Sequence, residues 1–249
     1  MKIAFTADAQ SYRITLDAPP LNILDIELLE ELRDALMHVR GDRHTLVIDA
    51  RGDRAFSAGA SVQDHRRETV VTMLRTFHDC FRILARVDVV TVALVRGVAL
   101  GGGCELALAC DFVLASADAT FGYPEIALGV FPPVGAYQAS RQLAPRKGLE
   151  LMLTGDPIDA ATAERLGLVN AVFESFDDDA TRWLERLHRH SASSLRLAKR
   201  AYRIAQADDF DARIAAVEQL YIDELTKTHD AEEGIAAFME KRAPDWRGE

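Results

Sequence analysis

Two glutamates stand in stretches of sequence that are otherwise apolar. Glu105 follows three consecutive glycines, and Glu125 follows Pro124 just before the apolar residues 126–128. Burial raises the pKa of a carboxyl group, and a carboxyl with a raised pKa can exchange protons with a substrate near neutral pH. Both are therefore candidates for acid–base chemistry. Two simpler interpretations stay open: Glu105 could complement a helix dipole, and Glu125 could be a solvated loop charge.

Two small-residue loops could supply backbone donors to the same chemistry. Residues 97–105 place three glycines between a β-branched apolar run and a helix-prone segment, so unpaired N–H groups and the positive end of a helix dipole coincide. Such a site suits an anion or a developing oxyanion. Residues 56–61 (FSAGAS) also leave N–H groups accessible, although a tight turn is the simpler interpretation of this loop.

Other site chemistries find little support in the sequence. The glycine run lacks the GxGxxG order of dinucleotide-binding turns, and the chain has no Gly-Lys-Ser/Thr phosphate loop and no GxSxG serine elbow. His188 and His190 are two residues apart on a charged helical segment and face different sides, so no metal site is predicted.

Strands and helices alternate around these residues. A hairpin is predicted from strands at 3–7 and 12–18, and a helix with Leu29, Leu32 and Leu36 on one stripe runs from Asp25 towards Gly41. Further strands are predicted at 44–50, 89–95, 112–117 and 120–123, with helices at about 68–85 and 104–111. This alternation predicts an α/β core.

Helical patterns dominate beyond about Arg146, and no Ser/Gly-rich or Pro-rich linker separates this part from the core. The C-terminal third is therefore expected to pack on the core or on a neighbouring subunit. An apolar stripe in this part would be hard for a monomer to cover; it comprises Ile214, Val217, Leu220 and Tyr221.

Composition limits the partners of the chain. With 29 Lys and Arg against 39 Asp and Glu, the net charge of −10 repels polyanions, so nucleic acid is not an expected partner. No run reaches the roughly 18 apolar residues of a membrane span, and the first residues lack the apolar core of a signal peptide. Three cysteines without CxxC spacing favour a reducing, cytoplasmic location.

Together the motifs resemble those of the crotonase, or enoyl-CoA hydratase/isomerase, superfamily, and the match spans the chain. It rests on PPLNILD, RAFSAGAS, VRGVALGGGCELALACD, ATFGYPEIALGVFP, LTGDPIDAATAERLGLVN and EGIAAFMEKRAPDW. The combination of PPLNILDI, VQDH and LGVFPPV looks closest to the branch of cyclohexa-1,5-diene-1-carbonyl-CoA hydratases.

The resemblance implies an α/β fold of the crotonase type, a spiral of ββα units with a C-terminal helical trimerisation region. The spiral core would cover residues 1–190 and the oligomerisation region residues 191–249 of a homotrimer or a homohexamer. It implies an acyl-CoA thioester as substrate, so that coenzyme A enters as part of the substrate, and no permanently bound cofactor.

The resemblance also assigns roles to residues. The backbone N–H groups of Ala60 and Gly102 would form the oxyanion hole, and each donor of this kind is worth about 3 to 4 kcal/mol in the transition state. Glu105 would activate water for attack at C3, and Glu125 would deliver the proton to C2, the two acting as one coupled unit.

Coenzyme A would contact the loop at Ala58, Ser61 and Val62, and Phe238 and Lys241 from the last helix of a neighbouring subunit. Packing or solvation of that helix is an equally good interpretation of the last two. A polyanionic cofactor also needs positively charged side chains at the entrance of its binding site. The candidates are Arg54, Arg96, Lys241 and Arg242.

The chain departs from the family pattern at two places. Ser61 stands where many members have Asp, and bulky residues replace a glycine-rich segment, which predicts an acyl pocket lined by Phe131, Pro133, Val134 and Tyr137.

The leading expectation is an acyl-CoA hydratase, a hydro-lyase that adds water across a C=C bond conjugated to the thioester. Isomerisation, decarboxylation or thioester hydrolysis on the same enolate chemistry is the alternative, as is a non-catalytic oligomeric binding protein. The identity of the acyl group stays open.

Overall fold

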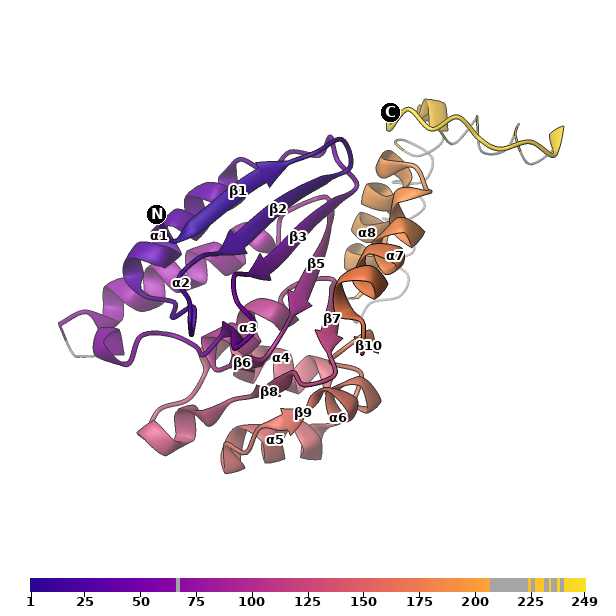
Figure 1. The fold of residues 1–249 in the computed structure, drawn as a ribbon. Helices are drawn as coiled ribbons and strands as arrows, with labels where there is room; N and C mark the ends of the chain where they lie inside the picture. Colours follow the sequence, from indigo (N-terminus) through magenta and orange to yellow (C-terminus); the bar gives the residue numbers. More distant parts are fainter. Residues whose placement is uncertain (66–67, 207–223, 225–226, 231–232, 234–236, 238–239) are drawn as a thin grey trace.

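The computed structural model describes residues 1–65, 68–206, 224, 227–230, 233, 237 and 240–249 (Figure 1). The strands are β1 (Ile3–Ala7), β2 (Ser11–Leu16), β3 (Thr45–Ala50), β4 (Ala55–Ser57), β5 (Val90–Val95), β6 (Val98–Leu100), β7 (Phe112–Ser116), β8 (Thr120–Gly122), β9 (Ile158–Asp159) and β10 (Ala171–Phe173). The helices are α1 (Ile26–Met37), α2 (Val70–Leu84), α3 (Gly102–Leu108), α4 (Pro133–Gln142), α5 (Pro145–Thr154), α6 (Ala160–Arg165), α7 (Phe176–His188) and α8 (Ala192–Ala205), with 3₁₀ helices η1 (Val62–His65) and η2 (Pro124–Leu128).

Two sheets are built together by a repeated ββα unit. The larger sheet has the order β1-β2-β3-β5-β7-β10, and the smaller one has the order β4-β6-β8-β9. Each of the pairs β3–β4, β5–β6 and β7–β8 contributes its first strand to the large sheet and its second to the small sheet, and a helix follows. The chain therefore winds as a spiral, and the predicted fold class is confirmed.

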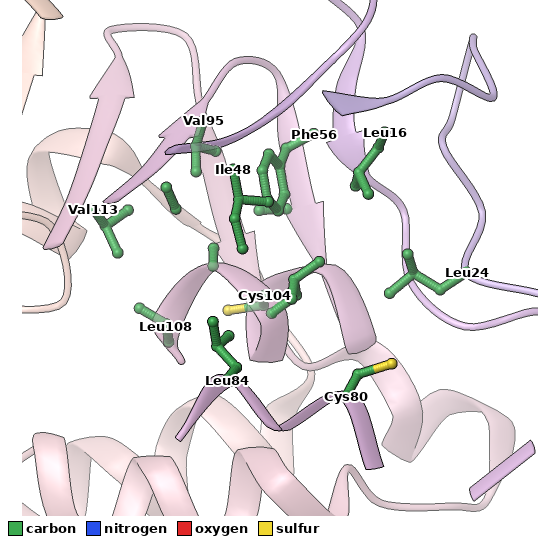
Figure 2. Packing of buried hydrophobic residues seen from close by; sticks show 14 of the residues in the cluster. Leu16, Leu24, Ile48, Phe56, Cys80, Leu84, Val95, Cys104, Leu108 and Val113 are labelled. Carbon is green, nitrogen blue, oxygen red and sulfur yellow. The ribbon is translucent and has the colours of Figure 1, made fainter. Parts of the chain in front are cut away.

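Apolar residues cover both faces of the large sheet. Leu46 and Ile48 of β3 pack with α1, α2 and α3, whereas Val47 between them packs with α7 on the opposite face. Figure 2 shows Cys104 of α3 between Ile48 on the sheet side and Leu84 of α2. Every residue of α3 is buried, so the helix that carries Glu105 is held in the centre of the core.

Local capping sets the ends of the elements near the site. Asp25 caps α1 because its side chain accepts a hydrogen bond from the Leu28 N–H.

The predicted hairpin and the strands near 44–50 and 89–95 form where expected. In contrast, β9 and β10 were not predicted, because two or three residues are too short to show a period.

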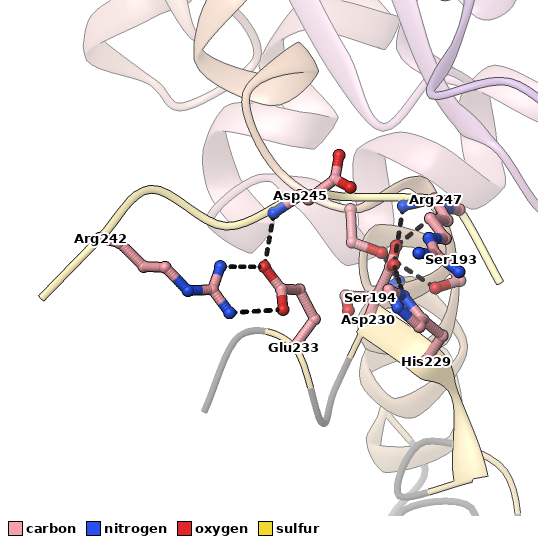
Figure 3. Close-up of polar contacts among 10 residues, drawn as sticks. Ser193, Ser194, His229, Asp230, Glu233, Arg242, Asp245 and Arg247 are labelled. Atoms are coloured by element: carbon pink, nitrogen blue, oxygen red, sulfur yellow. Dashed lines mark hydrogen bonds and ion pairs between the residues drawn. The ribbon is translucent and has the colours of Figure 1, made fainter. Parts of the chain in front are cut away.

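The helices after the core are attached by buried polar contacts. Lys199 of α8 is 7% exposed and lies 2.5 Å from Asp111, which follows α3. At the C-terminal end, Glu233 accepts two hydrogen bonds from Arg242 and one from the Asp245 N–H (Figure 3). The stripe predicted from Ile214, Val217, Leu220 and Tyr221 lies outside the described residues.

Candidate active site

A cavity that is open to solvent lies where the first residues of α3 meet the loop after β4. Segments far apart in the sequence form its wall: the β4 loop and η1, one side of α2, the start of α3, and η2 with the turn before α4. Its lining residues are Ala58, Gly59, Ala60, Val62, His65, Met73, Leu74, Phe77, Gly101, Gly102, Glu105, Pro124, Glu125, Leu128, Phe131, Pro132 and Pro133.

The start of α3 brings Gly102 next to Ala60. A Cβ added to Gly102 would lie 3.2 Å from the backbone nitrogen of Ala60. Gly102 is the first residue of α3, where an N–H group has no partner within the helix. Leu24 and Ala60 form an isolated parallel β-bridge, in which the Leu24 N–H donates to the Gly59 carbonyl and the Ser61 N–H donates to the Leu24 carbonyl. The Ala60 N–H takes no part in this bridge. Two backbone donors thus meet at the cavity.

Glycine is required here because the backbone segments touch. A Cβ on Gly103 would lie 2.3 Å from the Ser57 carbonyl oxygen, and Gly101 has a φ of 52°, in the left-handed region. The three glycines therefore allow β4 and α3 to approach closely, which places Gly102 beside Ala60.

Glu105 is 2% exposed and lies in the first turn of α3. Its Oε1 accepts a hydrogen bond of 2.6 Å from the Gly135 N–H at the start of α4. Burial raises the pKa of Glu105 to about 8, the Gly135 N–H opposes this rise, and the charge of Glu125 adds to it. The carboxyl is therefore poised to exchange a proton near neutral pH.

Glu125 lies on η2, and its carboxyl group lies beside the start of α3. A Cβ on Gly101 would lie 2.5 Å from its Oε1, and its Oε2 is buried without a hydrogen-bond partner in the described structure. Burial raises the pKa of Glu125, while its backbone and His65 act in the opposite direction. A solvated loop charge does not describe this residue.

The other predicted site residues divide between the cavity wall and positions outside it. Ala58, Val62, Phe131 and Pro133 line the cavity, whereas Ser61 does not. Val134 and Tyr137 of α4 are not among the residues that line it, and the predicted acyl pocket stays a prediction. Val134 packs against the core, and Tyr137 is 63% exposed with the Arg141 guanidinium over its ring.

Of the residues predicted to reach coenzyme A from a neighbouring subunit, Lys241 lies away from the cavity of its own chain. Phe238 is outside the described residues. Lys241 is exposed, and the segment 240–249 lies beyond α7 and α8 in Figure 1, distant from α3 and α4. Arg242 pairs with Glu233 and Arg96 pairs with Asp177, so neither side chain is a free cation.

Sequence reasoning missed two parts of the wall. His65 comes from η1, and α2 contributes an apolar side with Met73, Leu74 and Phe77. The amphipathic period of α2 predicted that this side is buried, but it could not show whether the side faces the cavity or the core. His65 entered the sequence analysis only as part of the VQDH motif, and a single histidine in a polar stretch is compatible with many roles.

The burial of Glu105 has a consequence for stability. Its pKa is raised from 4.5 to about 8, so between these values the folded state holds a proton that the unfolded state has released, and stability falls as pH rises. Glu105→Gln stays neutral and keeps an acceptor for the Gly135 N–H. We expect its melting temperature to exceed that of the wild type increasingly from about pH 4.5 to pH 8.

Thermal denaturation across this pH range measures the effect, with Glu164→Gln on the exposed surface of α6 as control. A difference between Glu105→Gln and wild type that does not change with pH would contradict the raised pKa.

Neither a metal cluster nor a membrane helix is found in the part of the chain that the structure describes. No three His, Cys, Asp or Glu side chains there come together as a metal ion requires. None of the described helices has the length and apolar character needed to cross a membrane.

Comparison with known proteins agrees with this arrangement. The model of the family described as enoyl-CoA hydratase/isomerase matches residues 7–249. A cyclohexa-1,5-dienecarbonyl-CoA hydratase of Thauera aromatica is 38% identical over 99% of this chain and 96% of its own length, and a 2,3-dehydroadipyl-CoA hydratase of Escherichia coli is 36% identical over 94% of each. The crystal structure of an enoyl-CoA hydratase from Bacillus anthracis superposes with a TM-score of 0.93 at 29% identity, covering both chains fully. The chain therefore belongs to the enoyl-CoA hydratase/isomerase family, the crotonase superfamily that its motifs predicted.

Proposed function

We propose that the chain is an acyl-CoA hydratase that adds water across a C=C bond conjugated to a coenzyme A thioester. One observation carries the proposal: two carboxyl groups with raised pKa values and two backbone donors line the same cavity. Hydration needs a group that takes a proton from water, a group that gives one to carbon, and a place for the enolate oxygen.

In this mechanism the thioester carbonyl accepts hydrogen bonds from the N–H groups of Ala60 and Gly102. As water attacks C3, Glu105 in its ionised form takes a proton from it, and negative charge develops on the carbonyl oxygen, where the donors and the N-terminal field of α3 stabilise it. Glu125 then gives a proton to C2. One C–O bond and one C–H bond form, the C=C π bond is lost, and the product is a hydroxyacyl thioester.

Retention of both carboxyls favours hydration over the other reactions of this fold. Isomerisation, decarboxylation and thioester hydrolysis also stabilise an enolate or oxyanion, but none of them needs two carboxyls facing one water. Curated relatives named as hydratases, including a crotonyl-CoA hydratase of Syntrophomonas wolfei at 34% identity, support the same choice. A non-catalytic binding protein would have no need of a buried Glu105 with a pKa of about 8.

We expect a cyclic 1,5-dienoyl thioester to be the better substrate than a short linear one. The Thauera aromatica relative is named for such a substrate, and Phe131, Pro132 and Pro133 place an aromatic ring and two fixed-φ prolines on the cavity wall. A flat ring would bury more carbon against this wall. Each buried CH₂ is worth about 0.8 kcal/mol, which gives a preference of roughly 10-fold to 100-fold in kcat/KM.

The test is to incubate the purified protein with linear and cyclic unsaturated acyl-CoAs and to follow water addition by mass spectrometry. The proposal expects hydration of at least one and fastest turnover of the cyclic diene. Equal or better turnover of crotonyl-CoA would contradict the substrate preference but not the reaction. No hydration of any would contradict the reaction itself.

The assembly and the location are proposed on other grounds. Residues 191–249 would form the oligomerisation region of a homotrimer or homohexamer. Within this region Tyr202 of α8 is 68% exposed, and Leu149 and Leu153 of α5, outside it, are also more than half exposed, so apolar surface is available for contact with another subunit. In such an assembly Phe238 and Lys241 would reach the coenzyme A site of a neighbour. Three free cysteines suit a reducing cytoplasm.

A further inference from the structure

Gln138 is a buried polar side chain of α4 that the hydration mechanism does not use. It is 4% exposed, and its amide makes two hydrogen bonds. Its Nε2 donates to the backbone carbonyl of Glu105 at 2.8 Å, and its Oε1 accepts from the hydroxyl of Tyr123 at 3.2 Å. A buried amide that is satisfied on both sides fixes the spacing of the segments that it joins.

The orientation of this amide follows from its two partners. A backbone carbonyl can only accept a hydrogen bond, so the NH₂ group of Gln138 faces Glu105. The amide oxygen therefore faces Tyr123, whose hydroxyl donates to it. The Glu105 carbonyl also accepts the helical hydrogen bond of the Ala109 N–H, so it would keep one partner without Gln138.

The same face of α4 also binds the carboxyl group of Glu105. The Gly135 N–H, three residues before Gln138, donates to this carboxyl at 2.6 Å. Residues three apart on a helix share a face, so both contacts with Glu105 come from one side of α4. Gln138 binds the main chain of Glu105, and Gly135 binds its side chain. The approach of the two helices at Gln138 therefore sets how well the Gly135 N–H reaches the carboxyl.

Tyr123 connects this contact to the second carboxyl. It lies two residues before Glu125, and it is 0% exposed. Its ring packs on Gly135, where an added Cβ would lie 2.7 Å from Cε1 of the tyrosine, and its hydroxyl binds Gln138. Gln138 thus lies at the centre of a set of buried contacts that joins the segments carrying Glu105 and Glu125.

We propose that Gln138 is a positioning residue of the hydratase: together with Tyr123, it fixes α4 so that the Gly135 N–H stays on the Glu105 carboxyl. The inference rests on the proposed function, in which ionised Glu105 takes the proton of water. Gln138 does not line the cavity, so it acts through Glu105. The Gly135 N–H favours the ionised form of this carboxyl, and a displaced α4 would leave the carboxyl protonated up to a higher pH.

The ionisable groups around Glu105 have to be considered in any titration. Among the described residues, Glu125 of η2 raises the pKa of Glu105 by its charge, and His65 of η1 opens on the same cavity and interacts with Glu125. Burial raises the pKa of Cys104 to about 12 and that of Tyr123 well above its usual value, so both stay neutral near pH 7. Replacing Tyr123 by Phe therefore changes no charge beside Glu105.

The test compares three variants. Gln138→Met keeps the length of the side chain and removes both hydrogen bonds, whereas Tyr123→Phe removes only the hydroxyl and keeps the ring. Gln142→Met is the matched control. One turn further along α4, the Nε2 of Gln142 donates to the Leu108 carbonyl at 3.1 Å, so this residue joins the same two helices away from the carboxyl group.

Two measurements follow the carboxyl group of Glu105. Infrared difference titration gives the midpoint of the carboxyl band that Glu105→Gln removes, and it needs no substrate. The wild type should titrate near pH 8 in this experiment. The pH profile of kcat with the best acyl-CoA of the panel gives the midpoint in the complex with substrate, because the ionised form is the base.

For Gln138→Met we expect both midpoints to rise by about one pH unit, the lower end for the loss of one hydrogen bond to a carboxylate. Below the midpoint kcat should fall about 10-fold with a smaller change in KM, and most of the rate should return at high pH. Tyr123→Phe should move both midpoints in the same direction by less, and Gln142→Met should match the wild type.

A kcat of Gln138→Met that falls by the same factor at every pH, with an unmoved infrared midpoint, would indicate a purely structural role and overturn the proposal. An equal shift in Gln142→Met would overturn it too. If circular dichroism shows that Gln138→Met does not fold, Tyr123→Phe decides, and an unmoved midpoint there contradicts the proposal. A wild type that hydrates none of the acyl-CoAs would refute the proposed function, whereas the infrared midpoints would still test the contact with Glu105.

Discussion

Glu105→Gln and Glu125→Gln should each lower the rate of hydration by at least about 10²-fold, the loss expected when a general acid or base is removed. Glutamine keeps the size of the side chain and an acceptor oxygen, so the Gly135 N–H retains its partner beside position 105. What each variant loses is the ability to take or give a proton. The effect should fall on kcat more than on KM.

The double variant should be little slower than the slower single variant, because two carboxyls that share one water act as a unit. Initial rates with the best acyl-CoA of the panel give all three values, and Glu164→Gln serves as the control for loss of a surface charge. If the two single losses multiply in the double variant, the carboxyls act independently and the coupled mechanism is wrong.

Gly102→Ala should lower kcat by roughly 10²-fold to 10³-fold, as removal of one oxyanion-hole donor does in other enzymes. The new Cβ would lie 3.2 Å from the Ala60 nitrogen and 3.0 Å from Cε2 of Phe77. Either the methyl group enters the space of the thioester oxygen, or Ala60 moves away from it. In both cases the two N–H groups no longer converge on one atom.

Gly41→Ala is the matched control, because the Cβ added there would meet only the flexible Arg196 side chain, at 3.2 Å. Steady-state kinetics and melting temperatures of both variants separate a damaged site from a damaged fold. Wild-type kcat in a well-folded Gly102→Ala variant would contradict the placement of the oxyanion hole.

Much of the arrangement was predictable because it follows from patterns that sequence carries directly. The β-branched run at β5, the glycines before α3 and the apolar surroundings of Glu105 each have a local physical reason, and the structure places them together. The convergence of Ala60 and Gly102 was predicted only through the family resemblance, since no local pattern indicates that residues 42 positions apart meet.

The remaining residues of the cavity wall could not be predicted, because their place depends on the three-dimensional position of each side chain. Tyr137 and Pro133 both belong to α4 and share a face of it, yet only Pro133 lines the cavity, because Tyr137 lies a full turn, about 6 Å, further along the helix. His65 was missed as part of the wall because only the fold brings η1 to the cavity that Glu125 also lines, 60 residues away in sequence.

The origin of the atoms added to the substrate tests the account most directly. Hydration run in water labelled with ¹⁸O and deuterium should give a hydroxyacyl-CoA with one labelled oxygen at C3 and one deuterium at C2, and Glu105→Gln together with Glu125→Gln should form almost none of it. A product that carries solvent hydrogen without solvent oxygen would indicate isomerisation, and free coenzyme A with an ¹⁸O-labelled acid would indicate thioester hydrolysis; either result would contradict water addition by the Glu105–Glu125 pair.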